Sequence, residues 1–192
     1  MKVKIIKEEK VFDHIFKIVS AELQHELYNG QMSEPVVRLN LDRGDAVAAV
    51  IFDMDRREAV FVRQFRYPVY SKQPSAAWLT EVIAGMAEEQ ETHEQAITRE
   101  VMEELGYTIS APEKIASFFV SPGATSGRVI LFYVEVTGHM KTGTGGGATG
   151  EGEDIQAVTY SLPALRAALD AGEFMDAKTV IGCNYLLRKF DC

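Results

Sequence analysis

The chain lacks the residue patterns that mark secreted, membrane-spanning and nucleic-acid-binding proteins. Only two of its 192 residues are cysteines, Cys183 and Cys192, and their spacing fits neither a disulfide framework nor a metal site. No apolar run reaches the length of a transmembrane helix, and the charged start, MKVKIIKEEK, has no signal-peptide core. Basic residues are few, 20 against 28 acidic ones, and the net charge of −8 disfavours general binding to nucleic acids or membrane surfaces. We therefore expect a cytoplasmic protein that binds a polyanion only where arginines or metal ions gather.

Length and patterning favour one main domain preceded by a small arm. Residues 1–42 read as loosely alternating strands, with a turn signal at Tyr28-Asn29-Gly30. They carry too little apolar material for a core of their own, so we expect this β arm to pack on the main domain or on a second subunit. The main domain is expected over residues 43–192.

The main domain interleaves predicted strands and helices. Strands are expected over residues 46–52, 59–65 and 128–136, in a short segment that leads to Gly85, and from Asp154 onward. Helices are expected over residues 92–105, 162–172 and 178–190. The glycine-rich stretch 142–152 reads as a mobile loop, and Trp78 as a core residue. This order predicts an α+β fold with a mixed sheet between helices.

An acidic helix dominates the middle of the chain. Between Gly85 and Tyr107, seven glutamates accompany a single arginine, Arg99. The seven are Glu88, Glu89, Glu91, Glu94, Glu100, Glu103 and Glu104. Thr92 is the expected N-cap and Gly106 the expected C-terminal stop of the helix.

Three of these glutamates share one helical face. Glu100, Glu103 and Glu104 lie three or four residues apart or adjacent, and like charges at that spacing repel by roughly 0.2–0.5 kcal/mol per pair. A bound cation would relieve this repulsion, and oxygen ligands without His or Cys favour Mg²⁺ or Mn²⁺ over zinc. The alternative is an ordinary solvated acidic face.

The spacing of this stretch resembles the Nudix box, G-x5-E-x7-R-E-U-x-E-E-x-G-U, where U is aliphatic. Every fixed charged or glycine position is matched, Val101 matches the first U, and Tyr107 departs from the last. The runs VRQFRYP, WLTEVIAGMAEE, SFFVSPGATSGR and GEGEDI are similar to the nucleoside-diphosphate-sugar branch of this family, which includes ADP-ribose and GDP-mannose pyrophosphatases. The resemblance implies an α/β/α sandwich and a homodimer in which the N-terminal arm is swapped.

The resemblance also implies roles for individual residues. Metal ligands would be Glu100, Glu104, Glu153 and the carbonyl of Ala84. Glu103 would be a further ligand or a partner of one, Arg99 would hold a carboxylate in place, and Glu151 would be the general base. The assignment of base and ligand between Glu151 and Glu153 stays open, as does the reading of both as solvated loop acids.

Two arginines are implied as substrate contacts. Arg66 matches a branch position that binds phosphate, and Arg38 a position near the nucleobase, which suits a guanidinium beside a diphosphate. Each is equally open to interpretation as surface charge. Gly127 stands where relatives often carry Glu, which puts the contacts of that loop in doubt.

The expected function is Mg²⁺-dependent hydrolysis of the pyrophosphate bond of ADP-ribose or a related nucleoside diphosphate sugar, giving a nucleoside monophosphate and a sugar phosphate. Within this class, GDP-mannose is the alternative substrate, because GEFMDAKTVIGCNYL resembles the GDP-mannose enzymes. From a different class, a Nudix-fold regulator could bind a nucleotide sugar without turnover, although such a sensor has no need of the intact acidic cluster.

Overall fold

The computed structural model describes residues 1–148 and 152–191. The chain forms two compact units: the first contains residues 1–45 and 118–128, and the second contains residues 46–117 and 129–192. The predicted boundary at residue 42 stays a prediction, and the first unit takes in a segment distant from the arm in sequence. In the part of the chain that the structure describes, no helix is long and apolar enough to cross a membrane.

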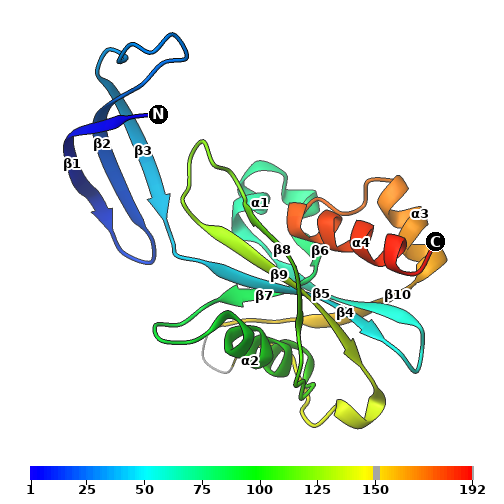
Figure 1. Cartoon of the computed structure of the whole chain (residues 1–192). Coiled ribbons are helices and arrows are strands. Elements are labelled where there is room, and N and C mark those ends of the chain that lie inside the picture. Colours follow the sequence, from blue (N-terminus) through cyan, green and yellow to red (C-terminus); the bar gives the residue numbers. More distant parts are fainter. Residues whose placement is uncertain (149–151, 192) are drawn as a thin grey trace. The chain divides into compact units, whose positions relative to one another are not determined.

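The first unit is built on a small antiparallel sheet, as the sequence predicts. Its strands β1 (Val3–Asp13), β2 (Lys17–His25) and β3 (Val36–Asp42) follow one another in space (Figure 1). The residues between β2 and β3 include the expected turn, where Gly30 has a φ of 83°. Residues 118–128 join this unit through a hydrogen bond of 2.9 Å from the amide of Leu41 to the carbonyl of Ala124.

The second unit is organised around a mixed sheet with the spatial order β10-β5-β4-β9-β8, in which β6 pairs with β5 and β7 with β4. The strands are β4 (Ala46–Asp53), β5 (Glu58–Phe65), β6 (Trp78–Glu81), β7 (Ile83–Met86), β8 (Glu113–Phe119), β9 (Arg128–Val136) and β10 (Gln156–Ser161). β4 and β9 run parallel, whereas β4 is antiparallel to both β5 and β7. The chain thus leaves β5, returns beside it as β6, and crosses to β4 as β7.

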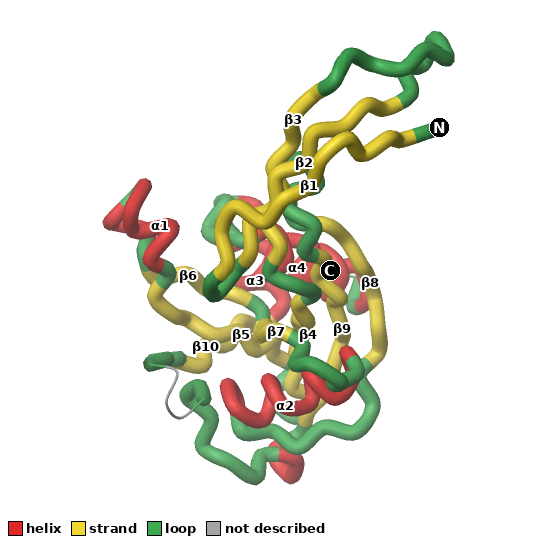
Figure 2. The backbone as a smooth tube through the Cα atoms, turned by 90° about the vertical axis from the view of Figure 1, so that its left-hand side faces the viewer, coloured by secondary structure: helices red, strands yellow, loops and turns green. Residues whose placement is uncertain are grey.

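Helices cover both faces of this sheet (Figures 1 and 2). The helices are α1 (Tyr67–Lys72), α2 (His93–Leu105), α3 (Leu162–Asp170) and α4 (Ala177–Lys189), with short 3-10 turns over Pro74–Ala76 and Gly138–Met140. On one face, Ile97 and Val101 of α2 pack in a buried cluster with residues of the central strands such as Val47 and Phe132. On the other, Val50 lies so close to Gly182 of α4 that a Cβ there would collide with it. The predicted α/β/α sandwich is confirmed.

Local sequence signals account for the ends of α2. The Thr92 hydroxyl accepts from the Gln95 amide at 3.2 Å, and the Gln95 side chain accepts from the Thr92 amide at 2.8 Å, forming a capping box. Gly106 ends the helix in the left-handed region, at a φ of 75°. By contrast, α1 was not predicted, because its six residues are too few for an amphipathic pattern.

Candidate active site

The acidic helix lies directly against the strand that precedes it. β7 carries Gly85, and a Cβ at that position would collide with the carboxylate of Glu100. Only glycine therefore lets α2 approach β7 closely enough for Glu100 to lie over the strand. Ala84, whose carbonyl is a predicted metal ligand, is the neighbouring residue in β7.

Arg99 joins the acids of α2 to the loop that leads into the helix. Its Nε and Nη2 donate to the two carboxylate oxygens of Glu91 at 3.2 and 3.0 Å, and Nη2 also donates to the carbonyl of Met86 at 3.0 Å. Its Nη1 donates to Glu100 at 2.7 Å and to Glu103 at 3.0 Å. These bonds raise the pKa of Arg99 and lower that of Glu91. All three guanidinium nitrogens are thus used to fix the position of the acidic face.

Glu104 is the most perturbed acid of the cluster. Its side chain is 3% exposed, and among the described residues its Oε2 has no hydrogen-bond partner. Burial raises the pKa of Glu104 to about 8, with the charges of Glu100 and Glu153 adding to the effect. The guanidinium of Arg66 and the backbone of Ala84 oppose this rise only in part. A buried carboxylate oxygen without a partner is costly, so this atom calls for a cation or a proton.

The described part of the glycine-rich stretch, up to Ala148, is hydrogen-bonded to the end of α2, and residues 149–151 of the predicted mobile loop lie outside the described residues. The amides of Gly146 and Gly147 donate to the carbonyls of Glu104 and Glu103 at 2.9 and 3.1 Å. These bonds satisfy carbonyls that the end of a helix otherwise leaves unpaired. A Cβ on Gly147, at a φ of 104°, would lie 2.7 Å from the Cβ of Glu153. The carboxylate of Glu153 in turn accepts from the amide of Ala148 at 3.1 Å, so the loop fixes this acid beside the helix.

Together these elements gather a set of hard oxygen donors. The charge of Glu153 acts on both Glu100 and Glu104, which places the three acids in one electrostatic cluster. Within residues 1–148 and 152–191, no three acidic, His or Cys side chains are already spaced to hold a metal ion. Arg99 engages Glu100 and Glu103 instead. The donor chemistry and the unpartnered oxygen of Glu104 nevertheless fit a hard divalent cation.

Comparison with known proteins identifies the family. The family model described as NUDIX domain matches residues 42–178. The chain belongs to the Nudix family. It is 34% identical over 184 residues to the ADP-ribose pyrophosphatase of Escherichia coli (strain K12), covering 96% of this chain and 87% of that protein. It is 28% identical over 185 residues to the GDP-mannose pyrophosphatase of Citrobacter koseri, covering 96% and 95% of the two chains.

A solved structure shares the fold of the whole chain. The crystal structure of ADP compounds hydrolase superposes with a TM-score of 0.74 at 19% identity, covering 99% of this chain and 94% of that one. At this identity the match bears on the fold alone. It agrees with the sandwich of helices around a mixed sheet described above.

The structure places the predicted site residues of this Nudix protein in different surroundings. The structure brings together the acids of the box, Arg99 and Glu153, as described above. Glu151, the predicted general base, lies outside the described residues. Arg38 belongs to the first unit, on an exposed part of β3, where its guanidinium donates to the carbonyl of Val37 at 3.0 Å. Gly127 also lies in that unit, and its amide donates to the Thr125 hydroxyl at 3.1 Å. All these roles stay predictions.

Arg66 belongs to a polar network that sequence reasoning missed. Its Nε and Nη2 donate to the two oxygens of Glu81, each at 2.9 Å, and Lys178 of α4 contacts the same carboxylate at 2.8 Å. Burial opposes the ionisation of Glu81, but the bonds from Arg66 and the charge of Lys178 outweigh it and lower its pKa. The signal available in the sequence was an acid inside the otherwise apolar strand segment WLTEVIAGM, since a buried acid requires a cationic partner.

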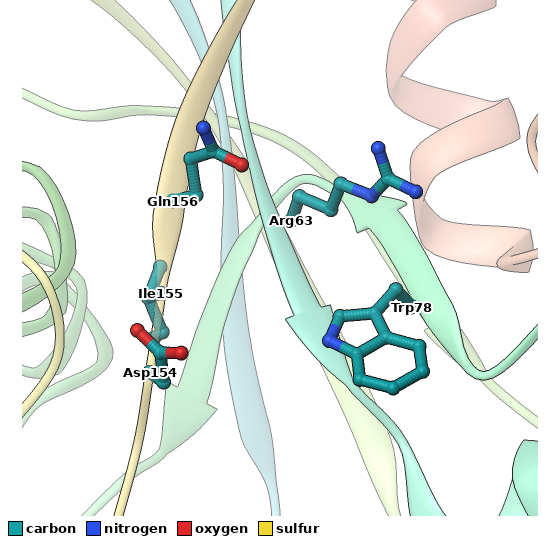
Figure 3. A pocket seen from close by; sticks show the side chains of 5 residues that line it. All are labelled: Arg63, Trp78, Asp154, Ile155 and Gln156. Carbon is teal, nitrogen blue, oxygen red and sulfur yellow. The ribbon is translucent and has the colours of Figure 1, made fainter.

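A cavity of about 620 Å³ opens at the start of β10, directly after Glu153 in the chain (Figure 3). Arg63, Trp78, Asp154, Ile155 and Gln156 line it. Trp78, expected in the core, is instead 58% exposed. Its indole packs at an angle against Phe65, with ring centroids 5.2 Å apart, and turns its remaining surface outward. The cavity therefore combines an aromatic surface with polar groups of both charges.

Proposed function

We propose that this Nudix hydrolase cleaves the pyrophosphate bond of a nucleoside diphosphate sugar, with ADP-ribose or a related compound as substrate. The products would be a nucleoside monophosphate and a sugar phosphate. The relatives named ADP-ribose and GDP-mannose pyrophosphatases support this substrate class over most of the chain. The single observation that carries the proposal is the buried, unpartnered oxygen of Glu104 inside a cluster of like charges.

A divalent cation, Mg²⁺ or Mn²⁺, is the group that these acids suit. Glu100, Glu104, Glu153 and the carbonyl of Ala84 would hold it, with Glu103 as a further ligand or a partner of one. When bound, it would neutralise charge on the diphosphate and make water a better nucleophile. Because the ligands are all oxygens, a softer ion such as zinc is disfavoured.

The chain's own residues would divide the remaining work. Arg99 orients the acids by holding Glu100 and Glu103 against the loop before α2. Glu151 would accept the proton of the attacking water, as the family resemblance implies. Arg66 would meet a phosphate oxygen through Nη1, since Nε and Nη2 are bonded to Glu81. The positive charge of Arg66 would then offset that of the diphosphate beside the acidic cluster.

The cavity at the start of β10 would hold one end of the substrate. Trp78 offers a surface on which a nucleobase or sugar ring can stack, while Asp154 and Gln156 offer hydrogen bonds to its polar groups. Arg38 would contact the nucleobase, as the resemblance implies. GDP-mannose remains the alternative substrate because of the 28% identical relative.

Assembly through the arm is part of the same proposal. Strand β1 is exposed along its whole length, and its apolar residues include Val3, Ile5 and Phe12 at 64, 51 and 47% exposure. Apolar surface on an edge strand is suited to covering by another subunit. We infer a cytoplasmic homodimer in which the arms contribute to the interface.

A substrate screen tests the function. Purified protein is incubated with ADP-ribose, GDP-mannose and related nucleotide sugars, with Mg²⁺, with Mn²⁺ or with EDTA, and the released phosphomonoesters are measured. We expect release only with a divalent ion, and a loss of several orders of magnitude in the Glu104→Gln variant. Glu94→Gln, the same change on an exposed position of α2, is the matched control and should keep full activity. Tight binding of a nucleotide sugar without any release would instead favour the regulator.

The roles of the two loop acids need separate variants. Glu151→Gln should lower the rate and leave metal affinity nearly unchanged, whereas Glu153→Gln should weaken metal binding. Isothermal titration calorimetry with Mg²⁺ and steady-state kinetics distinguish the two effects. The opposite pattern would exchange the two roles.

A further inference from the structure

We propose that Glu81 is a positioning residue, which aims the guanidinium of Arg66 at the substrate diphosphate, and that Lys178 holds Glu81 in the orientation this requires. The inference rests on the proposed function, because it concerns how the same site grips its substrate. It adds two residues, from β6 and from α4, to a site whose oxygen donors come from β7, α2 and the loop before β10.

The contacts of Glu81 fix the plane of the arginine. Two parallel hydrogen bonds of 2.9 Å join Nε and Nη2 of Arg66 to the two carboxylate oxygens. A guanidinium held in this way cannot rotate about its long axis without breaking both bonds. The edge that carries Nη1 therefore has a set direction. Arg66 is 37% exposed at its side chain, whereas Glu81 is only 2% exposed.

Lys178 also bonds to the carboxylate, at the Oε2 atom that accepts from Nη2 of Arg66. Its Nζ lies 2.8 Å from Oε2 of Glu81 and 2.9 Å from Oδ1 of Asp176, the N-cap of α4. Asp176 accepts from the amide of Thr179 at 2.9 Å, and the Thr179 hydroxyl accepts from the amide of Val82 at 2.9 Å. The network returns in this way to the residue next to Glu81. Glu81, Lys178, Asp176 and Thr179 each bond to two other members of this network. Arg66 bonds to Glu81, so its position is coupled to the start of α4.

The network also lies close to the acidic cluster. The charge of Arg66 acts on Glu104, so the guanidinium lies near enough to the acidic cluster to influence it. Val82 and Ile83 lead directly from Glu81 to Ala84. The cation of this network is partly exposed to solvent, with 37% of the Arg66 side chain accessible.

A double-mutant cycle separates positioning from a purely structural role. The values of kcat and KM are measured for the wild type, Glu81→Gln, Arg66→Ala and the double variant, with Mg²⁺ and the nucleotide sugar that the wild type hydrolyses fastest. We expect Glu81→Gln to lower kcat/KM by about 10–100-fold, similar to Arg66→Ala. In the Arg66→Ala background, Glu81→Gln should lower kcat/KM by less than about twofold, because no guanidinium remains to be positioned. Losses that multiply, or a Glu81→Gln variant with the wild-type rate, would overturn the proposal.

Binding measurements make the result independent of turnover. Calorimetry with Mg²⁺ alone should give affinities within about twofold of the wild type for Glu81→Gln, since the metal donors are untouched. Calorimetry with ADP in the presence of Mg²⁺ should show weaker binding, and the loss should again disappear in the Arg66→Ala background. If the wild type binds ADP and obeys this cycle but cleaves no nucleotide sugar, the proposed function fails while the positioning role stands. Equal ADP affinity in all four proteins would refute positioning.

A second pair of variants covers the case in which Glu81→Gln does not fold. Lys178→Met keeps the pairing of Arg66 with Glu81 but removes the anchor, and should lower kcat/KM by about 3–10-fold. Glu81→Asp keeps the charge but shortens the side chain, and should fall between the wild type and Glu81→Gln. Either loss should vanish in the Arg66→Ala background. If it persists there undiminished, Glu81 and Lys178 act on the fold and the proposal is wrong.

Discussion

Replacing Glu104 by glutamine should change the pH dependence of stability in the metal-free protein. Glutamine has nearly the same shape as glutamate but carries no titratable group. The wild-type carboxyl has a pKa raised to about 8 by burial and by its acidic neighbours, against 4.5 for the ordinary side chain. Between these two values the unfolded chain has lost its proton while the folded protein retains it. The unfolded state then binds fewer protons, so the free energy of unfolding falls as the pH rises.

The size of the effect follows from the interval between the two pKa values. A difference of one pKa unit corresponds to about 1.4 kcal/mol, so the contribution of Glu104 should decline by roughly 3–5 kcal/mol between pH 4.5 and pH 8. The contribution is fully present below pH 4.5 and is lost above about pH 8. This is a large share of the stability of a typical domain, which is about 5–15 kcal/mol. Glu104→Gln avoids the loss because its amide stays neutral.

Urea unfolding followed by circular dichroism measures the difference. Both proteins are unfolded in EDTA at intervals from pH 5 to pH 8.5, and the free energy of the wild type is subtracted from that of the variant. Titrating groups that do not interact with Glu104 cancel in this subtraction, so the difference reports Glu104 together with the neighbours whose charges act on it. The free energy of unfolding of the variant minus that of the wild type should increase steadily up to about pH 8 and stay constant above it. With Mg²⁺ at about 100 times its dissociation constant, the wild type should recover about 2.7 kcal/mol at pH 8.5.

Two results would refute this reasoning. A difference curve that is flat with pH would mean that Glu104 ionises normally in the fold, and that its oxygen is solvated rather than buried. Equal stabilisation of both proteins by Mg²⁺ would mean that the ion binds elsewhere. Glu94→Gln is again the control, since it makes the same substitution at an exposed position of α2.

Three further predictions test other parts of the site. Arg99→Lys should lower kcat/KM by about 10–100-fold in steady-state assays, because an ammonium cannot bridge three carboxylates as the guanidinium does. Gly147→Ala should weaken Mg²⁺ binding in calorimetry because the new Cβ would displace Glu153. Gly146 has the same φ of 104° but open space around it, so Gly146→Ala should lower stability and leave metal affinity unchanged. Trp78→Ala should raise KM for substrates whose base or sugar binds in the cavity. Comparing ADP-ribose with ADP-glucose, and ADP-glucose with GDP-glucose, shows whether discrimination of the sugar or of the base is lost; no change in either ratio would exclude the cavity.

The acidic helix could be predicted from the sequence because its determinants are local. The capping box, the left-handed glycine and the apolar stripe all lie within fifteen residues of one another, where helix geometry fixes which side chains meet. The requirement for Gly85 also follows from the box spacing. Its physical reason, the carboxylate of Glu100 lying over the strand, required the structure.

The pairing of Glu81 with Lys178 could not be predicted, because these residues lie 97 positions apart in the sequence. No periodicity relates them, and only the path of the chain from β6 through the sheet to α4 brings them together. The glycine-rich loop shows a different limit. Glycines that permit flexibility and glycines that a left-handed backbone requires look the same in composition. Gly145 and Gly147 are of the second kind, with φ values of 69° and 104°. A Cβ at either position would also lie within 3 Å of neighbouring atoms.

Arg99 explains how a row of acids can be kept together in the absence of a metal ion. Its Nη1 neutralises Glu100 and Glu103, while Nε and Nη2 are bonded separately to Glu91 and to the carbonyl of Met86. A dication could therefore replace Nη1 as the partner of Glu100 while Nε and Nη2 of the arginine keep their bonds to Glu91 and Met86. Glu104 has no such substitute cation, since Arg66 offsets its surroundings only in part and is itself bonded to Glu81. Of the box acids, Glu104 thus gains most from an ion, which is why its substitution should affect both metal binding and stability.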